Sequence, residues 1–261
     1  MTLFLHELKR NRLSLIIWTA VLSFMLLICV VIYPEMKAQM GELSEMFANM
    51  GSFSDAFGMD TLMDGGFFGY FAVECGEVLG IGGALFASIL GINALAKEQK
   101  DGTAEFLLSH PLSRAGVVTQ KLLAVTLQIT ILNLIITAVA MISTLLIGEE
   151  LEFKKMLLLF LSYYLLQIEI GALTFGISAF LRSNGIGFGL GIGLGAYFLN
   201  IAANLTEELE FLKYITPFGY TDGTRIAEEG SLDALCLLIG AVITVAGIVT
   251  AYARYMKKDI L

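Results

Sequence analysis

The chain has 261 residues, of which 57% are hydrophobic and only 15% carry a charged side chain. Its mean hydropathy is +0.79. Because a soluble domain usually has about 25% charged residues, this composition excludes a protein with an ordinary water-covered surface. The formal net charge of -8 and the lack of a basic patch in the sequence give no support to nucleic-acid binding.

About six apolar stretches follow one another along the chain, each able to cross a bilayer as a helix of about 20 residues. They lie at 13–33, closed by Pro34, and then within 67–96, 117–147, 153–181, 186–205 and 232–255. Basic residues precede the first stretch, as in a secretory signal peptide, but its apolar run is too long and no A-x-A-like cleavage site follows. The sequence therefore predicts an all-α polytopic membrane protein with about six transmembrane helices, with residues 1–261 as one domain.

The lysine and arginine residues between these stretches predict the orientation of the chain. An even number of spans places both termini on one side, which then holds Lys9, Arg10, Arg12, Lys97, Lys100, Arg114, Lys121, Arg182, Arg254, Lys257 and Lys258. The opposite side holds only Lys37, Lys154, Lys155, Lys213 and Arg225. Because cytoplasmic loops carry an excess of Lys and Arg, we expect both termini to be cytoplasmic and the loops 34–66 and 206–231 to be extracellular.

The cytoplasmic segment 1–12 contains the sequence "TLFLHELKRNR". It places Leu5 and Leu8 near one side of a helix, while its basic residues can reach lipid headgroups. We therefore include an N-terminal interfacial helix in the expected fold. A basic flank that simply anchors the first span fits the same residues equally well.

The cytoplasmic loop 97–116 has a pattern of its own. Its "DG" dipeptide at 101–102 breaks the preceding helix, because glycine adopts turn geometry at little steric cost. The following "TAEFLL" supplies a capping threonine, an acidic residue in the first helical turn and an apolar patch. Ser113 can then cap the third span. A charge-rich loop is usually a solvated connector, but an apolar patch rimmed by charge indicates a partner surface.

The sequence "KEQKDGTAEFLLSHPLSR", followed by "VVTQK", resembles the segment after the second span of ABC transporter permeases of the type 2 exporter class. The matching residues are Glu98, Gly102, Thr103, Glu105, Leu107, Leu108, Pro111, Ser113 and Arg114. The sequences "FLKYITPFGYTDG" and "YARYMKKDIL" are similar to that family's segment before the last span and to its basic C-terminal tail. With the six-span layout, the resemblance covers essentially the whole chain.

This resemblance implies the permease subunit of an ATP-driven exporter, a transport subunit without catalytic residues in a bacterial plasma membrane. Its short cytoplasmic coupling helix would dock on an ABC ATPase through Glu98, Gly102, Thr103, Glu105, Phe106, Leu107, Leu108, Pro111 and Arg114. The chain lacks the G-x-x-x-x-G-K-[ST] sequence that cradles phosphates, so ATP and Mg are expected on two copies of a partner ATPase. The resemblance also implies a second permease chain, identical or related.

Polar side chains inside the predicted spans are candidates for a transport pathway. Asn133 and Gln167 belong to polar stripes on the third and fourth spans, although such stripes also hold membrane helices together. Glu169 lies deep in the fourth span, roughly opposite the stripe that contains Gln167. A carboxylate there is costly, so a functional role is the default interpretation. A structural partner or protonation would also explain it.

Two further acidic candidates, Glu74 and Glu77, occur near the outer end of the second span. Helical periodicity predicts that they share a face with Tyr70. That face could contribute to the pathway. A helix end that projects into water explains these residues at least as well.

The fifth span begins "GIGFGLGIGLGAYF" and carries two sets of glycines spaced four residues apart. One set is Gly185, Gly189 and Gly193, and the other is Gly187, Gly191 and Gly195. Because glycine lets helix backbones approach closely in lipid, the sequence predicts a tightly packed or moving helix. In the permeases that it resembles, this span lies near the dimer interface and the central pathway.

Two other classes of function remain open, as does the substrate. A membrane-embedded enzyme would need a converging nucleophile, base or metal ligands, and Glu169 alone is insufficient. The sequence shows no metal-binding or catalytic spacing around its two histidines and three cysteines. A non-transporting immunity or structural protein would need no ATPase-docking loop. Peptide antibiotics, lipids, drugs and sodium all fit the sequence as substrates.

Overall fold

The computed structural model describes residues 2–47, 62, 65–97, 113–182 and 185–257. Six of its helices are long and apolar enough to cross a membrane. The first is α1 (Thr2–Phe47). The second is a continuous helix composed of α4 (Gly66–Tyr70), η1 (Phe71–Cys75) and α5 (Gly76–Ala94). The other four are α8 (Arg114–Leu146), α9 (Phe153–Ser178), α10 (Ile186–Leu205) and α12 (Ala234–Met256). The described residues include no strand. The predicted all-α polytopic fold is confirmed.

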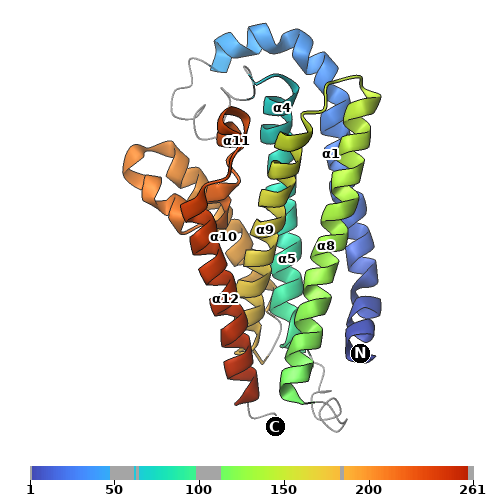
Figure 1. The fold of residues 1–261 in the computed structure, drawn as a ribbon, viewed down its shortest axis with the longest axis vertical. Coiled ribbons are helices and arrows are strands. Elements are labelled where there is room, and N and C mark those ends of the chain that lie inside the picture. Colours follow the sequence, from blue (N-terminus) through green and yellow to red (C-terminus); the bar gives the residue numbers. More distant parts are fainter. Residues whose placement is uncertain (1, 48–61, 63–64, 98–112, 183–184, 258–261) are drawn as a thin grey trace.

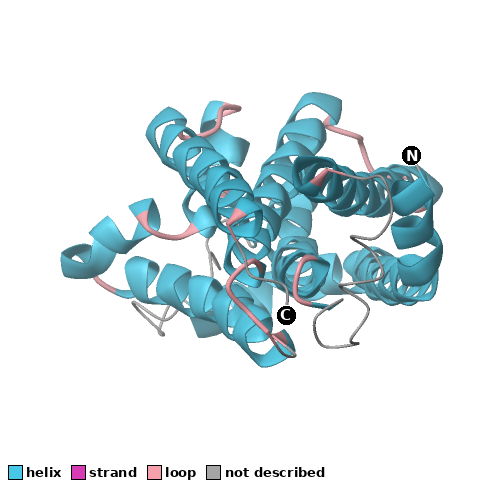
Figure 2. Ribbon diagram, turned by 90° about the horizontal axis from the view of Figure 1, so that it is seen from below, coloured by secondary structure: helices cyan, strands magenta, loops and turns pink. Residues whose placement is uncertain are grey.

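The spans form an elongated bundle in which α1 begins and α12 ends at the same end (Figure 1). We call this the terminal end and the opposite one the distal end. α5 and α9 lie at the centre and make the most extensive contact between helices, while α8 packs on α1, α10 on α5 and α12 on α9. Figure 2, the view from below, shows that helices make up nearly all of the described chain.

α1 differs from the prediction at both of its ends. It runs without interruption from Thr2 to Phe47, with Pro34 inside it, and the part after Pro34 bends over the distal end (Figure 1). Proline in a helix interior removes one hydrogen bond and kinks the helix, but the helix-forming residues that follow let it resume. The expected helix end at Pro34 was therefore wrong. Residues 2–12 extend the span instead of forming a separate interfacial helix.

The segment 206–231 is a compact distal cap made of η2 (Glu207–Tyr214), η3 (Pro217–Tyr220) and α11 (Gly223–Glu229). Side chains cap two of its three helices: the Thr216 hydroxyl accepts a hydrogen bond from the Phe218 N–H at the start of η3, and Asp222 accepts one from the Thr224 N–H at 2.9 Å at the start of α11. Asp233 accepts from the N–H groups of Leu235 and Cys236 at the start of α12. These N–H groups hold the pKa of the Asp233 carboxyl below its ordinary value.

Glycines on one face of α5 set its distance from α9. A Cβ atom on Gly83 would overlap the side chain of Gln167, and one on Gly91 would overlap Thr174. Near the distal end, a Cβ on Gly76 would lie 2.5 Å from the Tyr163 hydroxyl oxygen. The two central helices can therefore approach closely only because these positions carry no side chain.

The two glycine sets of α10 face different surroundings. A Cβ on Gly189 would lie 2.9 Å from Ile92 Cγ2, and one on Gly193 would lie 3.4 Å from Leu85 Cδ2. Both positions therefore pack against α5, and Gly185 also meets Ile92. In contrast, a Cβ on any member of the second set would find no atom within 4 Å: Gly187, Gly191 and Gly195. One set packs inside the chain, and the other borders open space beside it.

A buried ion pair joins three helices at the terminal end. Lys121 of α8 donates to Glu7 Oε1 of α1 at 3.0 Å and to the Ala94 carbonyl oxygen, the last residue of α5, at 2.6 Å. The side chains of Lys121 and Glu7 are only 1% and 4% exposed. Arg114, at the start of α8, donates to the Met256 carbonyl oxygen at the end of α12. The ends of four helices are thus fastened together, among them the end of α5 and the start of α8, which the loop 97–116 connects along the chain.

We predict that Lys121→Met lowers the free energy of unfolding by about 3 kcal/mol. Removing one partner of a buried ion pair leaves the other charge poorly compensated, at a cost of about 3–5 kcal/mol, and Arg10 remains paired with Glu7 to reduce that cost. Equilibrium unfolding of the purified chain in mixed micelles measures the change. The control is Lys155→Met, which removes a surface pair with Glu152 and a contact with the Phe68 ring, each worth about 0–1 kcal/mol. Equal effects of the two substitutions would contradict the prediction.

We also predict that Gly189→Leu destabilises the chain while Gly187→Leu does not. Leucine at 189 must displace Ile92 or the α5 backbone, because Ile92 Cγ2 and the Ser88 carbonyl oxygen lie 2.9 and 3.1 Å from the position of an added Cβ. Overpacking of this kind costs about 1–3 kcal/mol. Leucine at 187 meets open space and is the matched control. Unfolding of the two variants under identical conditions gives the comparison, and equal stability would show that the packing of α10 tolerates either side chain.

Candidate functional site

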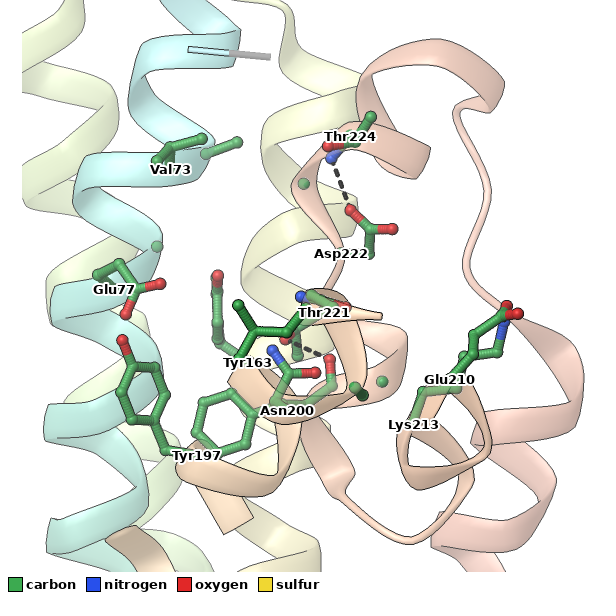
Figure 3. Close-up of a pocket in the computed structure, with 18 of the residues that line it drawn as sticks. Val73, Glu77, Tyr163, Tyr197, Asn200, Glu210, Lys213, Thr221, Asp222 and Thr224 are labelled. Atoms are coloured by element: carbon green, nitrogen blue, oxygen red, sulfur yellow. Dashed lines mark hydrogen bonds and ion pairs between the residues drawn. The ribbon is translucent and has the colours of Figure 1, made fainter. Parts of the chain in front are cut away.

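A cavity of about 670 Å³ opens at the distal end of the bundle. Its walls come from the helix η1–α5, from α9 and α10, and from the distal cap (Figure 3). The lining residues include Glu77, Tyr163, Tyr197, Asn200, Lys213, Phe218 and Asp222. We call this space the distal cavity. Its volume falls in the range of about 300–1,000 Å³ typical of small-molecule sites.

The wall on the α9 side is built by aromatic rings that fit against glycines of α5. Phe218 Cε1 and Tyr163 Cε1 would lie 3.0 and 3.2 Å from a Cβ atom on Gly80. Both rings are only 5% exposed, so they are firmly packed. Larger residues at Gly76 or Gly80 would push the rings into the cavity. The glycine spacing of α5 thus shapes the site as well as the bundle.

Glu77 is the acidic group of this site that projects from a membrane span. Its carboxylate and the Tyr197 hydroxyl of α10 point toward each other (Figure 3). Glu77 Oε2 is buried and accepts no hydrogen bond from the described residues. Glu74, three residues earlier, is not among the residues that line the cavity. Of the two acidic candidates on this span, only Glu77 belongs to the site.

Tyr70 and Glu77, which were predicted to share a face with Glu74, are directed toward different helices, and the helix changes its pitch between them. Residues Phe71–Cys75 form a π-helix, which has a wider turn than an α-helix and often marks a functional site. As a result, the Tyr70 hydroxyl donates to the Cys29 carbonyl oxygen of α1 at 2.8 Å. Glu77 is turned instead toward α10 (Figure 3). Hydrophobic periodicity carries no signal of a π turn.

The other charged residues of the distal cavity are engaged within the chain. Lys213 forms an ion pair with Glu210, and the hydrogen-bonded Glu210 carboxylate raises the pKa of Lys213 above its ordinary value. Asp222 caps α11. Three carboxylates and one ammonium group therefore line the cavity in the described part of the chain. The cavity carries an excess of negative charge that favours a cationic ligand.

The structure brings Asn133 and Gln167 together between α8 and α9. The Asn133 amide nitrogen donates to the Gln167 side-chain oxygen at 2.7 Å, and the reverse bond is 3.4 Å long. Both side chains are buried, and neither lines the distal cavity. This amide pair therefore connects two helices, as polar residues in membranes commonly do, and its part in a pathway stays a prediction.

Glu169 lies on the opposite side of α9, toward α12. It is 3% exposed and accepts a hydrogen bond from the Tyr220 hydroxyl at 2.8 Å. Burial and this carboxylate raise the pKa of the Tyr220 hydroxyl, which keeps it protonated as a donor. Glu169 also borders a small, mostly apolar cavity of about 260 Å³ beside Gly191 and Gly195. The sequence showed the carboxylate but not Tyr220, its partner in the distal cap.

Most of the predicted ATPase-docking residues lie outside the described residues: Glu98, Gly102, Thr103, Glu105, Phe106, Leu107, Leu108 and Pro111. The residues that frame this loop are described. Ser113 caps α8 by accepting a hydrogen bond from the Gly116 N–H at 3.1 Å, which confirms that prediction. Arg114 contacts the end of α12. Among the described residues, no group of three or more His, Cys, Asp or Glu side chains could hold a metal ion.

A comparison of the sequence with individually curated proteins returns no match. The model of the family described as "ABC-2 family transporter protein" matches residues 1–260. This match spans the same residues as the six-span bundle and agrees with the permease resemblance of the loop 97–116. The chain therefore belongs to the ABC-2 family of transporters, and it is a membrane-spanning permease subunit of an ABC transporter.

Proposed function

We propose that this permease forms the translocation pathway of an ATP-driven exporter and is driven by a separate ATPase subunit. The family match over residues 1–260 carries the proposal. The distal cavity and the loop 97–116 lie at opposite ends of α5. That helix has 19 residues and is about 28 Å long at 1.5 Å per residue. A continuous helix can link movement of the loop to the shape of the cavity.

The contacts at the terminal end support a mechanical role for the loop 97–116. The loop follows the end of α5 and precedes α8, and Lys121 joins these two helix ends to α1. Arg114 joins the same region to α12. A displacement of the loop by an ATPase would therefore be transmitted to four spans at once. Closure of two ATPase subunits around ATP and Mg, bound by them and not by this chain, would supply that displacement.

The proposed orientation places the terminal end in the cytoplasm and the distal cavity outside a bacterial plasma membrane. It follows from the excess of Lys and Arg at the terminal end. Export then requires that the cavity receive its substrate from the cell or inner leaflet in another state of the transport cycle. The distal cavity is the outward part of the proposed pathway.

A second permease chain, identical or related, completes the proposed transporter. The glycine set of Gly187, Gly191 and Gly195 borders open space beside α10. Phe188 and Phe198, on the same helix, are 69% and 62% exposed. Small residues on a lipid-facing helix favour close packing against another helix. These features support α10 as the contact with the second permease.

We predict that Phe106→Asp or Leu107→Asp abolishes stable association with the ATPase, because each replaces an apolar side chain of the proposed docking patch by a charge. The measurement is co-purification with the ABC ATPase that accompanies the wild-type permease from its native host. Substrate-stimulated ATP hydrolysis of the complex is the second readout, and we expect at least a tenfold loss.

The matched control is Phe211→Asp, which places the same charge at a 56% exposed phenylalanine of the distal cap. It should leave ATPase association unchanged, since the distal cap lies at the far end of the bundle. Normal co-purification and normal stimulated hydrolysis in both loop variants would contradict the proposed coupling.

A further inference from the structure

We propose that the distal cavity binds an organic cation, an ammonium group on an apolar or aromatic body, and that Glu77 holds the ammonium group. The proposal that the cavity binds this cation depends only on the geometry of the cavity. The further statement that the cation is the transported substrate rests on the proposed function. Three independent features of the cavity lead to this class of ligand.

The first feature is an unsatisfied acceptor. Glu77 Oε2 is buried, yet no described residue donates a hydrogen bond to it. Such an oxygen lacks its usual hydration and costs about 1–3 kcal/mol or more when its group is charged. The Tyr197 hydroxyl that faces Glu77 (Figure 3) has a single proton to donate, whereas a carboxylate has about four acceptor sites. A ligand with several N–H donors would supply what this carboxylate lacks.

The second feature is the charge around the cavity. Lys213, the basic residue that lines it in the described part of the chain, is paired with Glu210. Arg225 of α11 is paired with Glu229 and Asp233. These cations are committed to partners other than Glu77. A bound cation would therefore be attracted by the Glu77 carboxylate, whose charge these basic residues do not neutralise, whereas an anion would be repelled.

The third feature is the aromatic wall, which favours an organic cation over a metal ion as the ligand. The rings of Tyr197 and Phe218 meet edge to face with centroids 5.6 Å apart, and Tyr163 lies against the same wall. Tyr197 lines the cavity and is only partly buried, so its ring leaves surface for an alkylammonium group, which aromatic faces attract by about 0.5–2 kcal/mol. A hard metal ion instead requires six or more oxygen ligands, and the described residues contain no metal-binding group of three. The volume of about 670 Å³ also accommodates an organic body.

The test compares two ligands that differ only in the ammonium group. Dansylcadaverine carries a primary ammonium group on an aromatic body, and its N-acetylated derivative has nearly the same size without the charge. Both are titrated against the full-length purified permease in detergent micelles, and the signal of protein-free micelles is subtracted. We expect the wild-type chain to bind dansylcadaverine at least tenfold more tightly than the acetylated derivative.

Substitutions then assign the preference to Glu77. Glu77→Gln, which is nearly isosteric, should reduce the preference for the amine to less than twofold, whereas Glu77→Asp, which keeps the charge, should retain most of it. Glu208→Gln removes a carboxylate from an exposed residue of the distal cap that does not line the cavity, and should leave the preference unchanged. Circular dichroism and gel filtration confirm the fold of each variant.

Equal binding of the two ligands to the wild-type chain would overturn the inference, because it would show apolar partition without recognition of charge. A preference that survives Glu77→Gln would overturn it equally, since the charge would be recognised elsewhere. Neither ATPase nor nucleotide is present in this experiment. Its failure is therefore distinguishable from a failure of the proposed coupling, which co-purification of the ATPase measures.

Discussion

The close approach of α5 and α9 is the constraint on which the rest of this bundle depends. Lipid tails are as apolar as leucine side chains, so helix packing and hydrogen bonds must hold membrane helices together. Gly83 gives Gln167 the space in which it bonds to Asn133 of α8. Gly76 and Gly80 give the same space to Tyr163 and Phe218. One glycine face therefore stabilises the centre of the bundle and shapes the wall of the distal cavity.

The distal cavity and the start of the loop 97–116 adjoin opposite ends of the same central helix. At its distal end, the π turn Phe71–Cys75 directs Glu77 toward α10 and the cavity. At its terminal end, just before the loop 97–116 in the sequence, the Ala94 carbonyl oxygen accepts a hydrogen bond from Lys121. A helix that is tightly packed along its middle and held by specific contacts at both ends can transmit a movement of one end to the other. This arrangement gives the proposed coupling between an ATPase and the pathway a physical route.

Hydropathy predicted all six spans, and α10 begins and ends at the expected residues, because a span depends mainly on local composition. The Ser113 cap was also a local signal. Contacts between residues far apart in the sequence could not be predicted in this way. Glu7 and Lys121, for example, are 114 positions apart. Periodicity shows which residues share a face of a helix but not which other helix that face contacts. For the same reason the sequence predicted two glycine sets on α10 without showing that only one packs on α5. The cavity depends on Tyr163, Tyr197 and Phe218 from three separate segments, which no local pattern connects.

The central claim is that the distal cavity faces the outside of the cell and the loop 97–116 faces the ATPase in the cytoplasm. Thiol labelling of intact cells tests it most directly, after the native residues Cys29, Cys75 and Cys236 have been replaced by alanine. A single cysteine is introduced either at Asn204, an exposed residue lining the cavity, or at Ser109 in the loop. We expect a membrane-impermeant maleimide to label Asn204→Cys in intact cells and Ser109→Cys only after permeabilisation. The reverse pattern would contradict the orientation and the proposed direction of transport.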